Sequence, residues 1–135
     1  MEQDTSPEFL AELLDQEKRL VFKKFDNDAA IALGLILVEM ARVKSLPVVI
    51  DITKVGQQLF HVAMPGSSAD NDEWVKRKVA TVMRFGHSSY YMGRSCAAKG
   101  VVFTERYYLD PMRYAPQGGS FPIIIDGTGH VDRKS

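Results

Sequence analysis

The chain has 135 residues, of which 45% are hydrophobic and 25% are charged, and this balance is typical of a soluble globular protein. Such a composition excludes a disordered chain, a collagen-like fibre and a disulfide scaffold. Because 135 residues is a common single-domain size, we expect one domain over residues 1–135. Seventeen basic and seventeen acidic side chains cancel, so we expect no nucleic-acid and no membrane partner.

Cys96 is the only cysteine, so an intramolecular disulfide is impossible and a cysteine-based zinc site is not expected. A single free thiol is typical of a reducing compartment. Residues 1–4 lack the layout of a signal peptide, and the longest apolar run, residues 29–38, is shorter than the ~20 residues that a membrane span needs. These features predict a cytoplasmic protein.

The first helix is expected to begin after Ser6, because a capping serine, Pro7 at the first helical position and the acidic Glu8 form a helix start. A second helix should begin at Asp26 or Asn27 and end near residue 42. Its apolar residues cover nearly the whole circumference, so it needs burial on more than one side. Either the rest of the monomer or a partner subunit would cover the second side.

The remaining elements predict an α+β fold, in which helices pack on a mostly antiparallel sheet. Strands are expected at residues 20–22, 47–53, 58–64, 101–104 and 121–125. A long helix should run from Asp70 to about Phe85 and end at Gly86. After Gly93 the pattern becomes irregular until about residue 101.

One face of the long helix carries polar and aromatic side chains at helical spacing: Asp70, Trp74, Arg77, Thr81, Arg84 and Ser88. Such a face is often solvated, with the tryptophan half buried. It can equally form a polar pocket or a subunit contact, because Trp and Arg are common anchors of such surfaces.

Two motifs in this region resemble a known family. Residues 66–78 read G-S-x-x-D-N-x-x-W-x-x-R-K, and residues 84–93 read R-F-x-x-S-S-x-Y-x-G. Together with residues 49–52 and 118–122, they resemble an uncharacterised cytosolic branch of the haem-degrading-domain superfamily, whose relatives include the GlcG-like and HbpS-like proteins. The resemblance covers about residues 8–126.

The resemblance implies a profilin-like fold, with a central antiparallel sheet flanked by helices, and a ring-like or stacked homo-oligomer. The superfamily name also implies haem as a possible cofactor, although kinship of fold does not by itself transfer chemistry. The chain departs from the family in two ways. Its residues 127–135 are polar, so the last strand and helix of the family are expected to be missing and to leave a sheet edge exposed. The His-Glu iron motif of the haem-handling relatives is not found.

The histidines His61, His87 and His130 lack the spacing of metal ligands, so no metal site is predicted. His61 is interpreted as structural. His87 is the candidate haem ligand or general base, because it lies among hydroxyl groups and near Arg84. Ser88 or Ser89 would cap a following helix, or the backbone N–H groups there would hold a carboxylate or phosphate beside Arg84.

The leading hypothesis is a non-catalytic, homo-oligomeric protein that binds a small anionic ligand or a protein partner. Arginines would supply charge-assisted bonds, tryptophan an apolar wall and serines the anion cradle. The predicted site consists of Asp70, Asn71, Trp74, Arg77, Arg84, His87, Ser88, Ser89 and Tyr91. One alternative is a protein that binds or degrades haem or another tetrapyrrole, with His87 as ligand. The other is a pure assembly or adaptor protein. No catalytic residue is assigned.

Overall fold

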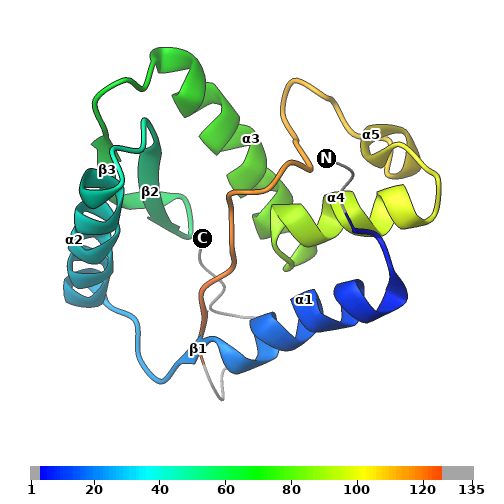
Figure 1. Cartoon of the computed structure of the whole chain (residues 1–135), viewed down its shortest axis with the longest axis horizontal. Helices are drawn as coiled ribbons and strands as arrows, with labels where there is room; N and C mark the ends of the chain where they lie inside the picture. The colour runs from blue at the N-terminus through cyan, green and yellow to red at the C-terminus, as the bar shows by residue number, and fades with distance from the viewer. Residues whose placement is uncertain (1–3, 126–135) are drawn as a thin grey trace.

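The computed structural model describes residues 4–125, which form helices around two small sheets (Figure 1). In chain order the elements are α1 (Pro7–Arg19), β1 (Val21–Phe22), α2 (Asn27–Val43), β2 (Val49–Lys54), β3 (Gln57–Ala63), α3 (Ala69–Phe85), α4 (Ser89–Ala98), α5 (Phe103–Arg106) and β4 (Ile124–Ile125). This order confirms the α+β class with a small antiparallel sheet flanked by helices. The expected absence of a last strand and helix concerns residues 126–135, which lie outside the described residues.

Within residues 4–125, each of the two sheets has two strands, and no described strand joins one sheet to the other. The hairpin of β2 and β3 is antiparallel, with Val49 opposite Ala63 and Lys54 opposite Gln57. In the second sheet β1 and β4 are parallel, with Phe22 opposite Ile125. The sequence predicted the hairpin but not this parallel pair, because its strands are only two residues long and lie at opposite ends of the chain.

The predicted helix starts are confirmed by side-chain caps. Ser6 Oγ accepts a hydrogen bond from the backbone of Phe9 at 3.2 Å, and Asp26 Oδ1 accepts one from Ala29 at 2.8 Å. The bond from Ala29 holds the pKa of Asp26 below its usual value. At its C-terminal end α3 stops at Gly86, whose φ of 72° is left-handed and therefore suits a glycine.

Two predictions about the C-terminal half are wrong. Helix α4 passes through Gly93 without interruption, since a glycine inside a helix costs only about 1 kcal/mol relative to alanine. The missing side chain lets the carbonyl of Pro116 approach closely. The strand expected at residues 101–104 is absent, and residues 103–106 form the short helix α5 instead. Phe103 is buried beside Met92 and Cys96 there. A short apolar run alone could not distinguish a strand from a buried helix.

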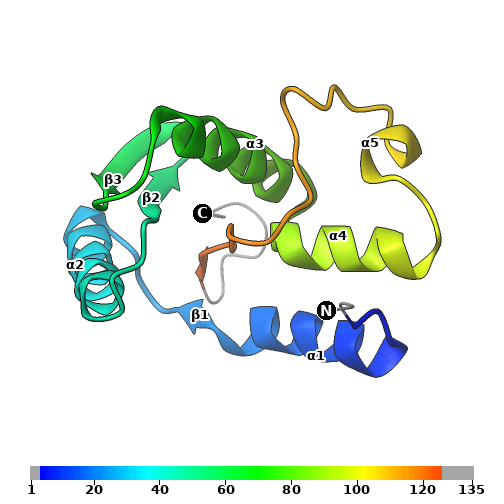
Figure 2. The same cartoon turned by 45° about the horizontal axis from the view of Figure 1, so that its top comes forward.

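Apolar clusters divide the described residues into two parts, one around α2 and the β2–β3 hairpin and the other around α4 and α5. Helix α2 packs on β2 and β3, and a close approach at Gly34 accommodates the ring of Phe60. Helix α1 runs beside α4, and α3 bridges the two parts (Figure 2). None of the helices within residues 4–125 is long and apolar enough to cross a membrane.

Candidate functional site

Glu17, His87 and Ser88 join α1 to the start of α4, and we call this group the α1–α4 junction. His87 Nδ1 lies 2.7 Å from Glu17 Oε1, and the backbone N–H of Ser88 donates to Glu17 Oε2 at 3.1 Å. The Glu17 side chain is only 6% exposed. The same Ser88 caps α4, because its Oγ accepts a hydrogen bond from the backbone of Tyr91 at 3.0 Å. A buried carboxylate therefore lies at the N-terminus of a helix, where the helix dipole favours a negative charge.

The junction leaves one ring nitrogen of His87 available. A neutral imidazole that donates its Nδ1–H to Glu17 carries a lone pair on Nε2. Among residues 4–125, no side chain or backbone group is bonded to this Nε2 atom. The His87 side chain is 39% exposed, and its ring lies 5.1 Å from that of Tyr91. Nε2 can thus act as a base or as a ligand for a metal ion.

His61, in contrast, is held at both ring nitrogens. Nδ1 lies 2.9 Å from Asp51 Oδ2, and Nε2 lies 3.0 Å from Asp72 Oδ1. The second contact is not aligned as a hydrogen bond, so it is an ion pair when the imidazole is charged. Gln58 and Thr53 donate further hydrogen bonds to Asp51, each at 2.6 Å. These contacts connect the hairpin to the first turn of α3, which agrees with a structural role.

The polar side chains in the middle of α3 fix the loop that follows α5. Arg77 Nη2 donates to the carbonyl of Pro111 at 2.7 Å, and the guanidinium lies 4.1 Å above the ring of Trp74. The fully buried Thr81 donates to the carbonyl of Ala115 at 2.8 Å and accepts from its backbone N–H at 3.1 Å. Arg77 and Trp74 are brought together as predicted. Nη2 of the guanidinium already has a partner within the chain, whereas Nε is buried without a hydrogen-bond partner among residues 4–125.

The other predicted site residues have separate surroundings. Ser89 exchanges hydrogen bonds with the backbone of Ser120, and Asn71 Oδ1 accepts from the backbone of Ser68 at 2.7 Å. Asp70 and Arg84 are exposed. The Arg84 guanidinium lies 5.9 Å from the centre of the Tyr114 ring. His87, Ser88 and Tyr91 therefore share one group of contacts, which Glu17 joins through His87 and Ser88. Arg77 and Trp74 form a separate pair.

Sequence reasoning missed Glu17. Its position follows Leu13 by one helical turn, on the apolar stripe of α1 that also carries Leu10 and Leu14. An acidic residue on an apolar stripe was the signal that could have marked it as a buried, paired carboxylate.

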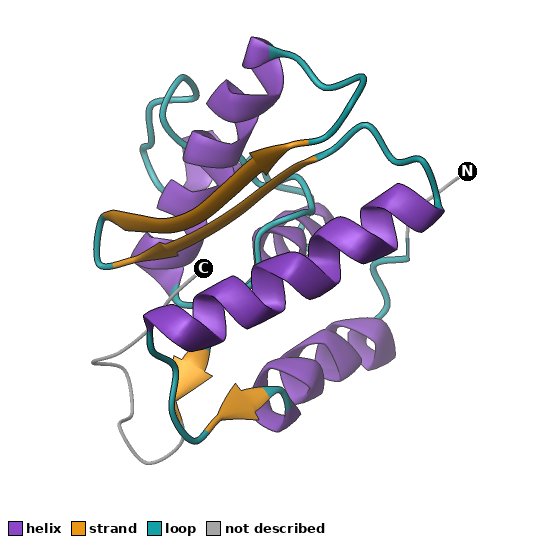
Figure 3. Ribbon diagram, turned by 90° about the vertical axis from the view of Figure 1, so that its left-hand side faces the viewer, coloured by secondary structure: helices purple, strands orange, loops and turns teal. Residues whose placement is uncertain are grey.

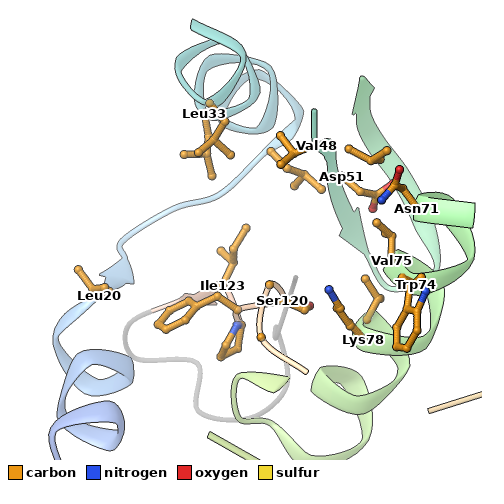
Figure 4. A pocket seen from close by; sticks show the side chains of 18 of the residues that line it. Leu20, Leu33, Val48, Asp51, Asn71, Trp74, Val75, Lys78, Ser120 and Ile123 are labelled. Carbon is orange, nitrogen blue, oxygen red and sulfur yellow. The ribbon is translucent and has the colours of Figure 1, made fainter. Parts of the chain in front are cut away.

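A cavity of about 770 Å³ lies between the two sheets. Leu33 from α2 and Val75 and Lys78 from α3 point into it, and Ser120 and Ile123 form the opposite side (Figure 4). The lining is mainly aliphatic, and Lys78 is its only basic residue. Of the predicted site residues, only Asn71 and Trp74 line this cavity.

The described residues offer little else for metal or covalent chemistry. Residues 4–125 contain no group of three His, Cys, Asp or Glu side chains that could hold a metal ion. Burial raises the pKa of the Cys96 thiol, so this cysteine is held in its unreactive, protonated form.

Comparison with known proteins places the chain among uncharacterised relatives. Residues 25–131 match the family described as "Haem degrading protein HbpS-like". A UPF0303 protein of Streptomyces coelicolor is 54% identical over 90% of this chain and 77% of its own length. One from Edwardsiella ictaluri is 46% identical over 94% of this chain and 81% of its own length. The crystal structure of the Ybr137w protein superposes with a TM-score of 0.83 at 34% identity, over 93% of this chain and 75% of that one.

Proposed function

Because this chain belongs to the HbpS-like family of haem degrading proteins, we propose that it binds haem or a related tetrapyrrole through Nε2 of His87. The observation that carries this proposal is the 2.7 Å contact between His87 Nδ1 and Glu17 Oε1. Histidines that ligate metals usually donate their other ring N–H to a carboxylate or carbonyl, which fixes the ring and raises its basicity. Glu17 makes this contact in the α1–α4 junction.

The residues of the junction fit an iron ligand in three respects. The buried carboxylate of Glu17 orients the ring, the cap of α4 fixes the backbone beside it, and the ring is accessible from one side. Bound haem would supply a redox-active iron, whose properties depend on its axial ligand and on the polarity of its surroundings. Residues of this chain would hold that iron through one imidazole.

The cavity between the sheets fits this role less well. Its volume of about 770 Å³ is within the range of ligand pockets, which is roughly 300–1,000 Å³. However, haem iron is held by His, Cys, Met or Tyr side chains, and none of the described residues lining the cavity is of these types. We therefore place the iron ligand at the α1–α4 junction and not in the cavity.

The hypothesis of a small anionic ligand has weaker support, because groups of the chain already occupy the expected cradle. The carboxylate of Glu17 accepts the N–H of Ser88, the hydroxyl of Ser89 contacts Ser120, and Arg77 bonds to Pro111. Arg84 remains exposed and could pair with a propionate of a tetrapyrrole. We keep the expectation of a non-catalytic binding role. We also keep the cytoplasmic location, which the buried Cys96 thiol supports.

A haemin titration followed by absorbance tests the proposal, with the two described histidines compared. The unchanged chain should give a saturable shift of the Soret band. His87→Ala should weaken binding by at least about tenfold, because the iron loses its ligand. His61→Ala is the matched control and should bind as the unchanged chain does, since both nitrogens of His61 already contact carboxylates. Equal affinities of the unchanged chain and His87→Ala would overturn the proposal.

A further inference from the structure

The cavity between the sheets has two apolar walls that come from different helices. Leu33 and Leu37 of α2 form one wall, and Val75 and Val79 of α3 form the other. Figure 3 shows α2 in front of the molecule, with the hairpin above it and the short strands below it. The volume of about 770 Å³ is within the range of pockets that bind small ligands. The walls therefore favour a ligand that carries aliphatic groups on two sides.

The edge of β2 that borders this cavity carries backbone groups without partners among the described residues. Met64 donates its backbone N–H to the carbonyl of Val48 at 2.9 Å, so the bonded residues of the hairpin are Val48 and every second residue after it. In an antiparallel pair, the residues between them point their N–H and C=O groups away from the partner strand. These residues are Val49 and Asp51, and both line the cavity. Within the described part of the chain, nothing is bonded to their backbone groups, which we call the open edge of β2.

The third feature of the cavity is the ammonium group of Lys78, which points into it from α3 (Figure 4). This group forms no ion pair and no hydrogen bond within residues 4–125. The other charged side chain in the described lining is Asp51. Its carboxylate is already engaged, because it accepts hydrogen bonds from two side chains of the hairpin and contacts His61 at 2.9 Å. Lys78 is therefore the charge that lacks a counterion here, and a carboxylate of a ligand would supply one.

We propose that the cavity binds a short apolar peptide in extended form, with a free carboxylate at its C-terminus. The peptide backbone pairs with the open edge of β2, and its successive side chains alternate between the walls of α2 and α3. Its carboxylate forms a charge-assisted bond with Lys78. A simple aliphatic acid would also contact the walls and Lys78, but it would leave the open edge of β2 unbonded. This site is independent of the proposed haem ligand, because no residue of the α1–α4 junction lines the cavity.

Fluorescence of Trp74 tests the site in the full chain, since Trp74 is the only tryptophan and lines the cavity. The probe is an acetylated peptide of four valines with a free C-terminal carboxylate, and it should change the emission saturably. The same peptide with a C-terminal amide should bind about tenfold more weakly, because it offers Lys78 no charge. A peptide with methylated backbone nitrogens should also bind about tenfold more weakly, because it cannot donate to β2. The proposal is overturned if the first peptide gives no saturable change, or if either modified peptide binds as tightly.

A pair of lysine variants tests where the carboxylate lies. Lys78→Met removes the charge but keeps an unbranched side chain, so it should weaken binding of the free-carboxylate peptide by about tenfold. It should also abolish the difference between that peptide and its amide. Lys76→Met is the matched control on the same helix, because Lys76 is exposed, pairs with Glu73 and does not line the cavity. This variant should bind as the unchanged chain does. A preference for the carboxylate that persists in Lys78→Met would contradict the proposal.

Discussion

The α1–α4 junction and the cavity between the sheets differ in the kind of contact that closes them. At the junction, both oxygens of Glu17 are bonded, and the helix end beside them is capped by Ser88. Around the cavity, β2 pairs with β3 and β4 pairs with β1, and the two sheets face each other across a space of about 770 Å³. One region is closed by specific polar contacts, whereas the other has apolar walls.

The comparison shows what each type of contact can do for a site. Polar contacts are directional, so Glu17 fixes the position and the tautomer of His87 as well as its distance. Aliphatic walls such as Leu33 and Val75 exclude water but impose no orientation. The junction is therefore the better place for a ligand that must be held at one atom. We expect the cavity to tolerate changes in the size of its lining side chains better than the junction tolerates changes in its polar contacts.

The largest effect is expected at the junction itself. Glu17→Ala should lower the free energy of unfolding by about 3 kcal/mol, because it removes a buried acceptor from Ser88 and from His87. Glu12→Ala on the exposed side of the same helix should change it by less than about 0.5 kcal/mol. Urea denaturation measures both. Equal stability of the two variants would mean that the junction contributes no specific stabilisation.

A smaller difference in stability is expected between the same substitution at two valines of α3, Val82 and Val79. Val82 is fully buried, so Val82→Leu should overpack its surroundings and lower the free energy of unfolding by about 2 kcal/mol. Val79 lines the cavity, where an additional methylene group has room. Val79→Leu should therefore change stability by less than about 0.5 kcal/mol. Thermal denaturation of the pair gives the answer, and equal losses would show that the cavity side is as tightly packed as the core.

The sequence predicted those features of the fold that depend on neighbouring residues. The caps at Ser6, Asp26 and Ser88 each bond to a backbone N–H three residues away, so a short window contains the whole interaction. The hairpin of β2 and β3 is similarly local. The parallel pair of β1 and β4 was not predictable in this way, since its two strands meet only after the intervening chain has folded.

In the candidate site, too, contacts between residues close in sequence could be predicted, whereas contacts between distant residues could not. The stacking of Arg77 on Trp74 follows from a spacing of three residues on one helix. The partner of His87 lies 70 residues earlier in the sequence, and no periodicity connects the two. Hydroxyl groups near His87 suggested an open anion cradle, whereas Ser88 and Ser89 are engaged within the chain. Residue types alone could not show that an internal carboxylate fills the N-terminus of α4.

The most direct test of this account is the tautomer of His87, measured by nitrogen-15 NMR of the ring at a pH at which the imidazole is neutral. The contact with Glu17 requires the proton on Nδ1 and a lone pair on Nε2, the atom proposed to bind iron. We expect the Nδ1–H form, and we expect it to be lost in Glu17→Ala. A proton on Nε2 in the unchanged chain would contradict the account, because Nδ1 could then not donate to Glu17 and Nε2 would have no lone pair for a ligand.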